Sequence, residues 1–176
     1  SLASAATFVG TATKADDFCR EGPRKELNGE TTCYGEITRE GMANLMRQMP
    51  SQCQLTKESV FLDLGSGDGR FPAFVRVASA VKEAVGIEMV TCRHERAIKR
   101  QATMAPGDGP RSNAHLTYLH GDALVLGLRN ATHLFMHSTC FRLPLIRSIL
   151  QMATTVGCIL KYGEMDHGER HDAFAN

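Results

Sequence analysis

The stretch FLDLGSGDGR, residues 61–70, limits more than any other what this chain can fold into. Residues 60–64 form a short apolar run of the kind found in buried strands, and three glycines follow it within five residues. From Phe71 onward, apolar residues recur at helical spacing. Glycines let the backbone approach a ligand closely and adopt positive φ, and the first N–H groups of a helix face outward. The segment therefore predicts a strand, a glycine turn and a helix that together hold a nucleotide-like ligand.

The rest of the chain alternates between apolar strands and amphipathic helices. Five strands in this alternation predict an α/β fold with a doubly wound, mostly parallel, Rossmann-like sheet, whose ligands bind at the carboxyl ends of the strands. We expect an irregular N-terminal arm at 1–32, one core at 33–162 and a polar tail at 163–176. Beyond the first strand, further strands are expected at 84–88, 115–119, 132–136 and 156–160, and helices at 38–50, 92–104 and 142–152.

Composition narrows the class of protein. With 176 residues, 43% of them hydrophobic, the chain can bury one core. A net charge of +1 argues against strong direct DNA binding, and no apolar run approaches the roughly 18 residues of a membrane helix. Six cysteines without a C-x-x-C pair are typical of reduced thiols, and no zinc or other metal site is expected. These features predict a soluble intracellular protein.

Acidic residues at and near two strand ends indicate which kind of nucleotide-like ligand the turn would bind. Asp63 ends the first strand, and Glu88 ends the next one roughly 20 residues later, where a ribose-binding carboxylate is expected. Asp68 lies inside the glycine turn, where it would repel a diphosphate but attract an ammonium group. The turn therefore favours S-adenosyl-L-methionine (SAM), with S-adenosyl-L-homocysteine (SAH) as its product, over a dinucleotide.

A SAM site divides the candidate residues by position. Asp63 and Asp68 would flank the methionine end, and Glu88 would accept hydrogen bonds from the ribose hydroxyls. Asp122, in a GD turn after the third strand, would accept from the adenine amino group. The segment Gly65, Ser66 and Gly67 would let the cofactor approach the backbone.

The end of the fourth strand carries the candidate substrate-side residues. Methyl transfer from a sulfonium requires the nucleophile to be held in line and, for a lysine, to be a neutral amine. His137 could accept a proton or orient the substrate, although a histidine at a strand end is as often a hydrogen-bonded structural residue. Ser138 and Phe141 follow it.

Several segments together resemble one enzyme family, the non-SET histone H3 lysine methyltransferases of the disruptor-of-telomeric-silencing type. CYGEIT resembles that family's YGE segment, DLGSGDG its DLGSGVGQ, VGIEM its VGVE and HGDAL its GDF, while LFMHSTCF stands where the family has FVNNFAF. The resemblance covers about residues 33–162 in the same order. It implies a class I SAM-dependent methyltransferase fold that acts on histone H3 in nucleosomes, in the nucleus.

The resemblance also implies roles for individual residues. Tyr34 and Glu36 would belong to a loop that closes over the cofactor, and Phe141 would match an aromatic residue of the lysine channel. The family's Asn pair is replaced here by His137 and Ser138, and its glutamine after the turn by Arg70. The sequence ends where the family continues with a final pair of strands, so we expect either a truncated catalytic core or a substrate channel that is built differently.

Two other functions remain open. DLGSGDGR also resembles the mitochondrial lysine methyltransferases, which would place the protein in mitochondria or cytosol and its substrate outside chromatin. A catalytically weak SAM-binding module that serves as a partner surface is the second alternative, since the loop after the fourth strand differs from the family's.

Overall fold

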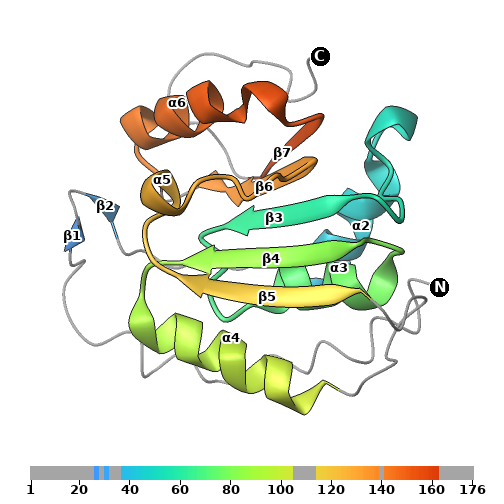
Figure 1. Cartoon of the computed structure of the whole chain (residues 1–176), viewed down its shortest axis with the longest axis horizontal. Helices are drawn as coiled ribbons and strands as arrows, with labels where there is room; N and C mark the ends of the chain where they lie inside the picture. Colours follow the sequence, from blue (N-terminus) through green and yellow to red (C-terminus); the bar gives the residue numbers. More distant parts are fainter. Residues whose placement is uncertain (1–25, 28–29, 32–36, 105–113, 139–140, 163–176) are drawn as a thin grey trace.

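The computed structural model describes residues 26–27, 30–31, 37–104, 114–138 and 141–162. Within them, one parallel sheet is flanked by helices (Figure 1). A two-stranded antiparallel pair, β1 (Glu26–Leu27) and β2 (Glu30–Thr31), lies in the arm that the sequence predicts to be irregular. No helix among these residues is both long and apolar enough to span a bilayer.

The central sheet has five parallel strands. These are β3 (Val60–Leu64), β4 (Glu83–Glu88), β5 (His115–His120), β6 (His133–His137) and β7 (Cys158–Tyr162). Their order in the sheet is β5-β4-β3-β6-β7, so the chain runs outward from β3 in one direction and then returns to its other side. This order confirms the predicted doubly wound α/β fold.

Helices cover both faces of the sheet. They are α2 (Arg39–Gln48), α3 (Arg70–Ala78), α4 (Thr91–Thr103), α5 (Ala123–Leu126) and α6 (Leu143–Met152), with short 3-10 turns η2 (Ser51–Cys53) and η4 (Ala153–Thr155). In Figure 1, α2 and α3 lie behind the strands, and α6 lies on the opposite side of the picture from α4. The sequence predicts every one of these elements to within about two residues except α5, η2 and η4.

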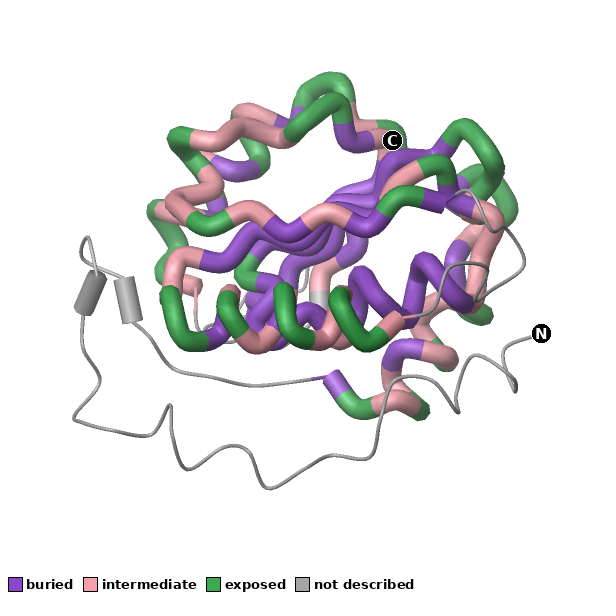
Figure 2. The backbone as a smooth tube through the Cα atoms, turned by 60° about the horizontal axis from the view of Figure 1, so that its bottom comes forward, coloured by how far each residue is buried: buried purple, intermediate pink, exposed green. Residues whose placement is uncertain are grey.

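Alternation along the strands divides the core in two. In β3, Phe61 packs with the side chains of α2, α3 and α4, whereas Leu62 and Leu64 pack on the α6 side. The three central strands, β3, β4 and β6, are buried along most of their length, while the outer surfaces of the helices are exposed (Figure 2). Because both faces are covered, the strands read as nearly continuous apolar runs in the sequence.

Residues next to the two ends of helix α2 determine where it begins and ends. The Thr38 hydroxyl caps its first turn by accepting from the Gly41 amide at 3.1 Å. The helix ends before Pro50. Met42 and Met49 are buried and belong to the hydrophobic core. Ile37 and Met42 bring this helix next to the glycine turn.

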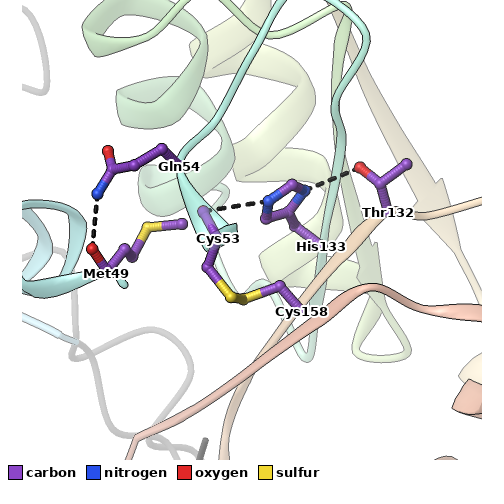
Figure 3. The surroundings of a disulfide bond; sticks show 6 residues. All are labelled: Met49, Cys53, Gln54, Thr132, His133 and Cys158. Atoms are coloured by element: carbon purple, nitrogen blue, oxygen red, sulfur yellow. Dashed lines mark hydrogen bonds between the residues drawn. A yellow bond between two sulfur atoms is a disulfide. The ribbon is translucent and has the colours of Figure 1, made fainter. Parts of the chain in front are cut away.

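A disulfide at the amino edge of the sheet corrects the sequence analysis. Cys53 in η2 is bonded to Cys158, the first residue of β7, with 5.6 Å between their Cα atoms (Figure 3). The prediction of reduced thiols is therefore wrong for these two residues. They lie 105 residues apart in the sequence, and only the fold brings them within disulfide distance. Cys92 is a free, exposed thiol.

Candidate functional site

The glycine turn between β3 and α3 is built around backbone conformations that favour glycine. Gly65, Gly67 and Gly69 all have positive φ, between 56° and 80°. At Gly69 a Cβ atom would lie 2.5 Å from Cζ of Tyr118, so a side chain would collide with a buried ring there. The Tyr118 hydroxyl donates to the Gly69 carbonyl at 2.6 Å. The turn is therefore both tight and held from the neighbouring strand β5.

Strand β4 holds the other end of the turn. The amides of Gly65 and Ser66 both donate to the Ile87 carbonyl, at 2.9 and 3.0 Å. Oε2 of Glu88 accepts from the Gly67 amide at 2.8 Å, and Oε1 accepts from the Val90 amide at the same distance. Glu88 thus anchors the turn, a role that the sequence does not indicate. A carboxylate has about four lone-pair sites, so Glu88 can accept further hydrogen bonds from a ligand.

Asp63 lies at the carboxyl end of β3 and is 4% exposed. Burial, and after it the nearby Glu88 carboxylate, hold the pKa of Asp63 well above its usual range. A buried acid of this kind ionises more readily when a cation lies beside it. Asp63 is therefore placed to respond to a positively charged ligand group.

Asp68 is paired with two arginines, which changes its predicted role. Its Oδ2 lies 3.1 Å from Nε of Arg70 and 2.8 Å from Nη2 of Arg100. The two guanidinium groups neutralise this carboxylate, so the argument that Asp68 would repel a diphosphate is wrong in that form. Its other oxygen, Oδ1, is buried and has no hydrogen-bond partner in the part of the chain that the structure describes.

A pocket opens where the turn, β6 and α2 meet. Its empty volume is about 340 Å³, including the solvent at its mouth. The buried Ser66 hydroxyl lacks a hydrogen-bond partner among the described residues, as Asp68 Oδ1 does. Polar and apolar groups share the wall of the pocket: Ile37, Met42, Asp63, Gly65, Ser66, Gly67, Asp68, Arg70, Phe71, Phe135 and His137.

The candidate substrate-side residues lie around the same end of β6. His137, its last residue, lines the pocket and is partly exposed, while Ser138 behind it is buried. A Cβ atom on Gly65 would lie 3.0 Å from Cζ of Phe141, so this ring packs against the glycine turn. The fold therefore brings His137 and Phe141 next to the first half of the turn.

Among the described residues, the predicted site residue Asp122 is not part of the pocket wall. Asp122 caps α5 by accepting from the Leu124 amide at 2.8 Å, and it stands at the same edge of the sheet as Glu88, one strand further out. Tyr34 and Glu36 lie outside the described residues. No group of three or more metal-binding side chains occurs in the described ranges.

Sequence reasoning missed Arg100. It lies on α4 and reaches the glycine turn, where it contacts Asp68. A signal was present in the helix period: Arg93, Ala97 and Arg100 follow one another at i, i+4 and i+7, and the first two are buried. This spacing places Arg100 on the inner stripe of the helix.

Solved structures with a similar arrangement were found at low identity. YjhP from E. coli is 21% identical with a TM-score of 0.46, over 65% of this chain and 44% of that one. YcgJ from Bacillus subtilis is 13% identical with a TM-score of 0.48, over 68% and 47%. TrmK from M. capricolum, solved with S-adenosyl-homocysteine, is 11% identical with a TM-score of 0.43, over 67% and 46%. This chain spans less than half the length of these structures.

Matches among sequences are confined to a family model. None of the curated proteins matches this chain. Residues 24–105, a little under half of the chain, match the family described as histone methylation protein DOT1. The matched segment contains CYGEIT, DLGSGDG and VGIEM. The resemblance to the disruptor-of-telomeric-silencing family that these motifs predict is therefore confirmed over residues 24–105.

Proposed function

We propose that this chain is a SAM-dependent methyltransferase whose pocket at the glycine turn holds the amino-acid end of the cofactor. The observation that carries the proposal is the pair of unpartnered buried acceptors, Ser66 Oγ and Asp68 Oδ1, at a turn that matches the DOT1 family. A buried acceptor without a partner costs about 1–3 kcal/mol, so a ligand that supplies N–H or O–H groups recovers that energy. The SAM ammonium group supplies such donors.

The residues of the pocket fit this cofactor. The glycine at position 65 leaves room between the turn and the Phe141 ring, where a Cβ atom would crowd. Asp63 would ionise beside the positive charge of the cofactor. The Glu88 carboxylate has lone pairs that the Gly67 amide does not use, so it would accept hydrogen bonds from the ribose while it also anchors Gly67. Asp122 would face the adenine from the end of β5.

Methyl transfer from SAM requires the chain to position the substrate amine and to keep water away from it. When bound, SAM supplies a methyl group on a positively charged sulfur, which a neutral amine can attack directly. The chain must then orient the amine and exclude water from it. Phe135 and Phe141 provide apolar surface beside the turn, and His137 stands where it can accept the proton of an incoming ammonium.

The proposed substrate is a lysine of histone H3 in nucleosomes, and the proposed location is the nucleus. The DOT1 match supports both, because that family is described by histone methylation. Tyr34 and Glu36, which stand in the matched segment, would form the loop over the cofactor. We further propose the division into an arm at 1–32, a methyltransferase core at 33–162 and a tail at 163–176.

The test uses the recombinant chain with tritiated SAM and three acceptors: nucleosomes, free histones and a mitochondrial extract. The proposal predicts label in histone H3 of nucleosomes, lost in Asp63→Asn. Label in mitochondrial proteins alone would overturn the histone substrate and keep the methyltransferase. Failure of the chain to bind SAM would overturn the proposal as a whole.

A second function is a SAM-binding module that serves as a partner surface. It is favoured by one observation, the replacement of the family's Asn pair by His137 and Ser138 beside the pocket. This alternative predicts SAH binding in calorimetry together with no label in any acceptor. Restoring the pair as His137→Asn/Ser138→Asn would then be expected to raise incorporation.

A further inference from the structure

The carboxylate of Asp68 is held by a residue from a distant helix. Arg100, in the last turn of α4, donates from Nη2 to Asp68 Oδ2 at 2.8 Å and from Nε to the Asp68 carbonyl at 3.1 Å. One guanidinium group therefore fixes both the backbone and the side chain of one turn residue. Such two-point contacts are what the planar, forked guanidinium does best.

The geometry of a carboxylate links this contact to the pocket. Because the two oxygens share one plane, a contact that fixes Oδ2 also fixes the direction of Oδ1. Asp68 lines the pocket, and its Oδ1 is the oxygen left without a partner among the described residues. The side chain of Asp68 is 8% exposed, so solvent screens this arrangement little.

The charge balance favours a zwitterionic ligand group. A free carboxylate at position 68 would attract an ammonium but repel a carboxylate on the same ligand. Ion pairing with Arg70 and Arg100 removes that repulsion and leaves Oδ1 as an acceptor. An amino-acid end, which carries both charges, matches this balance better than a lone amine.

We propose that Arg100 is a positioning residue for the cofactor: by holding Asp68 it aims Oδ1 at the ammonium and lets the pocket accept the neighbouring carboxylate. This inference rests on the proposed function, since the ligand is the amino-acid end of SAM or SAH. Arg100 does not line the pocket itself and acts through Asp68.

Two ligands and two variants test the inference. SAH has the amino-acid end, whereas 5′-methylthioadenosine lacks it and serves as an internal control. In calorimetry, Arg100→Met is expected to weaken SAH about tenfold or more, as loss of a charged hydrogen bond does, and to leave methylthioadenosine binding within about threefold. Arg100→Lys keeps the charge but not the fork, so it should recover only part of the loss.

Controls separate positioning from long-range charge. Lys99→Met removes one positive charge from an exposed position of the same helix and is expected to leave both affinities unchanged. In an Asp68→Asn background, Arg100→Met should weaken SAH by a smaller factor than in the native chain, because the two residues act as a pair.

The outcomes distinguish this inference from the proposed function. Unchanged SAH affinity in both Arg100 variants, or an equal loss for both ligands, would overturn the role of Arg100 and leave the SAM site standing. If the native chain bound neither ligand, the proposed function and this inference would both fail.

Discussion

The two edges of the parallel sheet differ in their buried oxygen acceptors, although among the described residues the amino edge also holds one unpartnered buried nitrogen, Nη1 of Arg76, whose Nε donates to the Ala114 carbonyl. At the amino edge, His133 Nε2 donates to the Cys53 carbonyl at 3.2 Å, and its Nδ1 lies 2.8 Å from the Thr132 hydroxyl (Figure 3). Since a carbonyl can only accept, Nε2 carries the proton, and the single Thr132 hydroxyl proton has two acceptors within reach, Nδ1 of the neutral ring and the Val60 carbonyl at 3.2 Å. At the carboxyl edge, Ser66 Oγ and Asp68 Oδ1 have no partner within the described residues.

This difference indicates that the amino edge contributes mainly to stability and the carboxyl edge mainly to ligand binding. Satisfied hydrogen bonds and a disulfide at the amino edge stabilise the folded chain, while unpartnered acceptors and a buried acid at the carboxyl edge cost stability until a ligand binds. Changes at the amino edge should therefore lower the melting temperature with little effect on ligand affinity. Changes at the carboxyl edge should alter affinity most.

Removal of the disulfide is expected to have the largest effect on stability. For Cys53→Ala/Cys158→Ala, loss of a cross-link that closes a loop of this length costs about 4.7 kcal/mol, or on the order of 10–20 °C in melting temperature. Calorimetric scans measure this effect. SAH affinity at 15 °C should change less than about threefold, and Cys92→Ala is the control. A larger loss of affinity than of stability would contradict the division between the edges.

The same cysteine pair bears on the proposed location. Disulfides are rare in nuclear proteins, where thiols are kept reduced. Alkylation of the protein in rapidly quenched cells, followed by mass spectrometry, reports the state of Cys53 and Cys158. A nuclear protein in the reduced state should melt below the oxidised one by the amount stated for the alanine pair.

Substitution of a glycine in the turn is expected to have the second-largest effect on stability. Gly69→Ala places a side chain at φ 80° and against Tyr118, and is expected to destabilise the chain by about 2 kcal/mol or more. It should also abolish SAH binding, because α3 and the turn shift together. Urea unfolding gives the stability, and Gly157→Ala, where the nearest atom is 3.6 Å away, should be nearly neutral. Equal stability of both variants would contradict the close contact.

Asp63→Asn is expected to act in opposite directions on stability and affinity. An acid with a raised pKa binds an extra proton in the folded state, so the chain loses stability as pH rises from 3.8 through the raised value. Above that window the asparagine variant should melt a few degrees higher than the native chain. Its SAH affinity should fall about tenfold or more. A variant that is less stable at neutral pH yet binds normally would contradict this account.

The smallest expected effect is a pH dependence at the amino edge. Burial lowers the pKa of His133 below 6.5, so the unfolded chain binds the proton more readily. Stability should be flat above about pH 6.5 and fall as pH drops from there through the lowered pKa. Urea titrations at pH 7.5 and 5.5 measure the loss, which His133→Gln should reduce. The more exposed His94, whose pKa is also lowered, gives the matched variant His94→Gln, with a smaller effect.

Much of the sheet could be predicted because each strand is a local apolar run. The predicted strands at 60–64 and 84–88 differ from β3 and β4 by no more than one residue. Helix α2 was likewise fixed by Thr38 and Pro50, which act within one turn of it. The parallel, doubly wound arrangement of the sheet followed from the alternation of strands with helices.

Long-range pairs could not be predicted in this way. Cys53 meets Cys158 only because β7 lies beside β6, and no local pattern marks that pairing. Arg100 meets Asp68 across 32 residues, so its role depended on how α4 packs on the sheet. The contact between Glu88 and the Gly67 amide could not be predicted either, because the two residues are brought together only by the fold. The sequence indicated a ribose-binding role for Glu88 and not its hydrogen bond to the turn.

The most direct test of the central claim is a thermal scan of the native chain with SAH and, separately, with NAD⁺, each at saturating concentration. The paired state of Asp68 makes this comparison necessary, because charge alone no longer excludes a diphosphate. If the carboxyl edge binds SAH, a concentration about 100 times its Kd should add about 2.7 kcal/mol, or on the order of 5–10 °C, and NAD⁺ should add nothing. An unchanged melting temperature with SAH, or a rise with NAD⁺ instead, would contradict the assignment of the glycine turn to SAM.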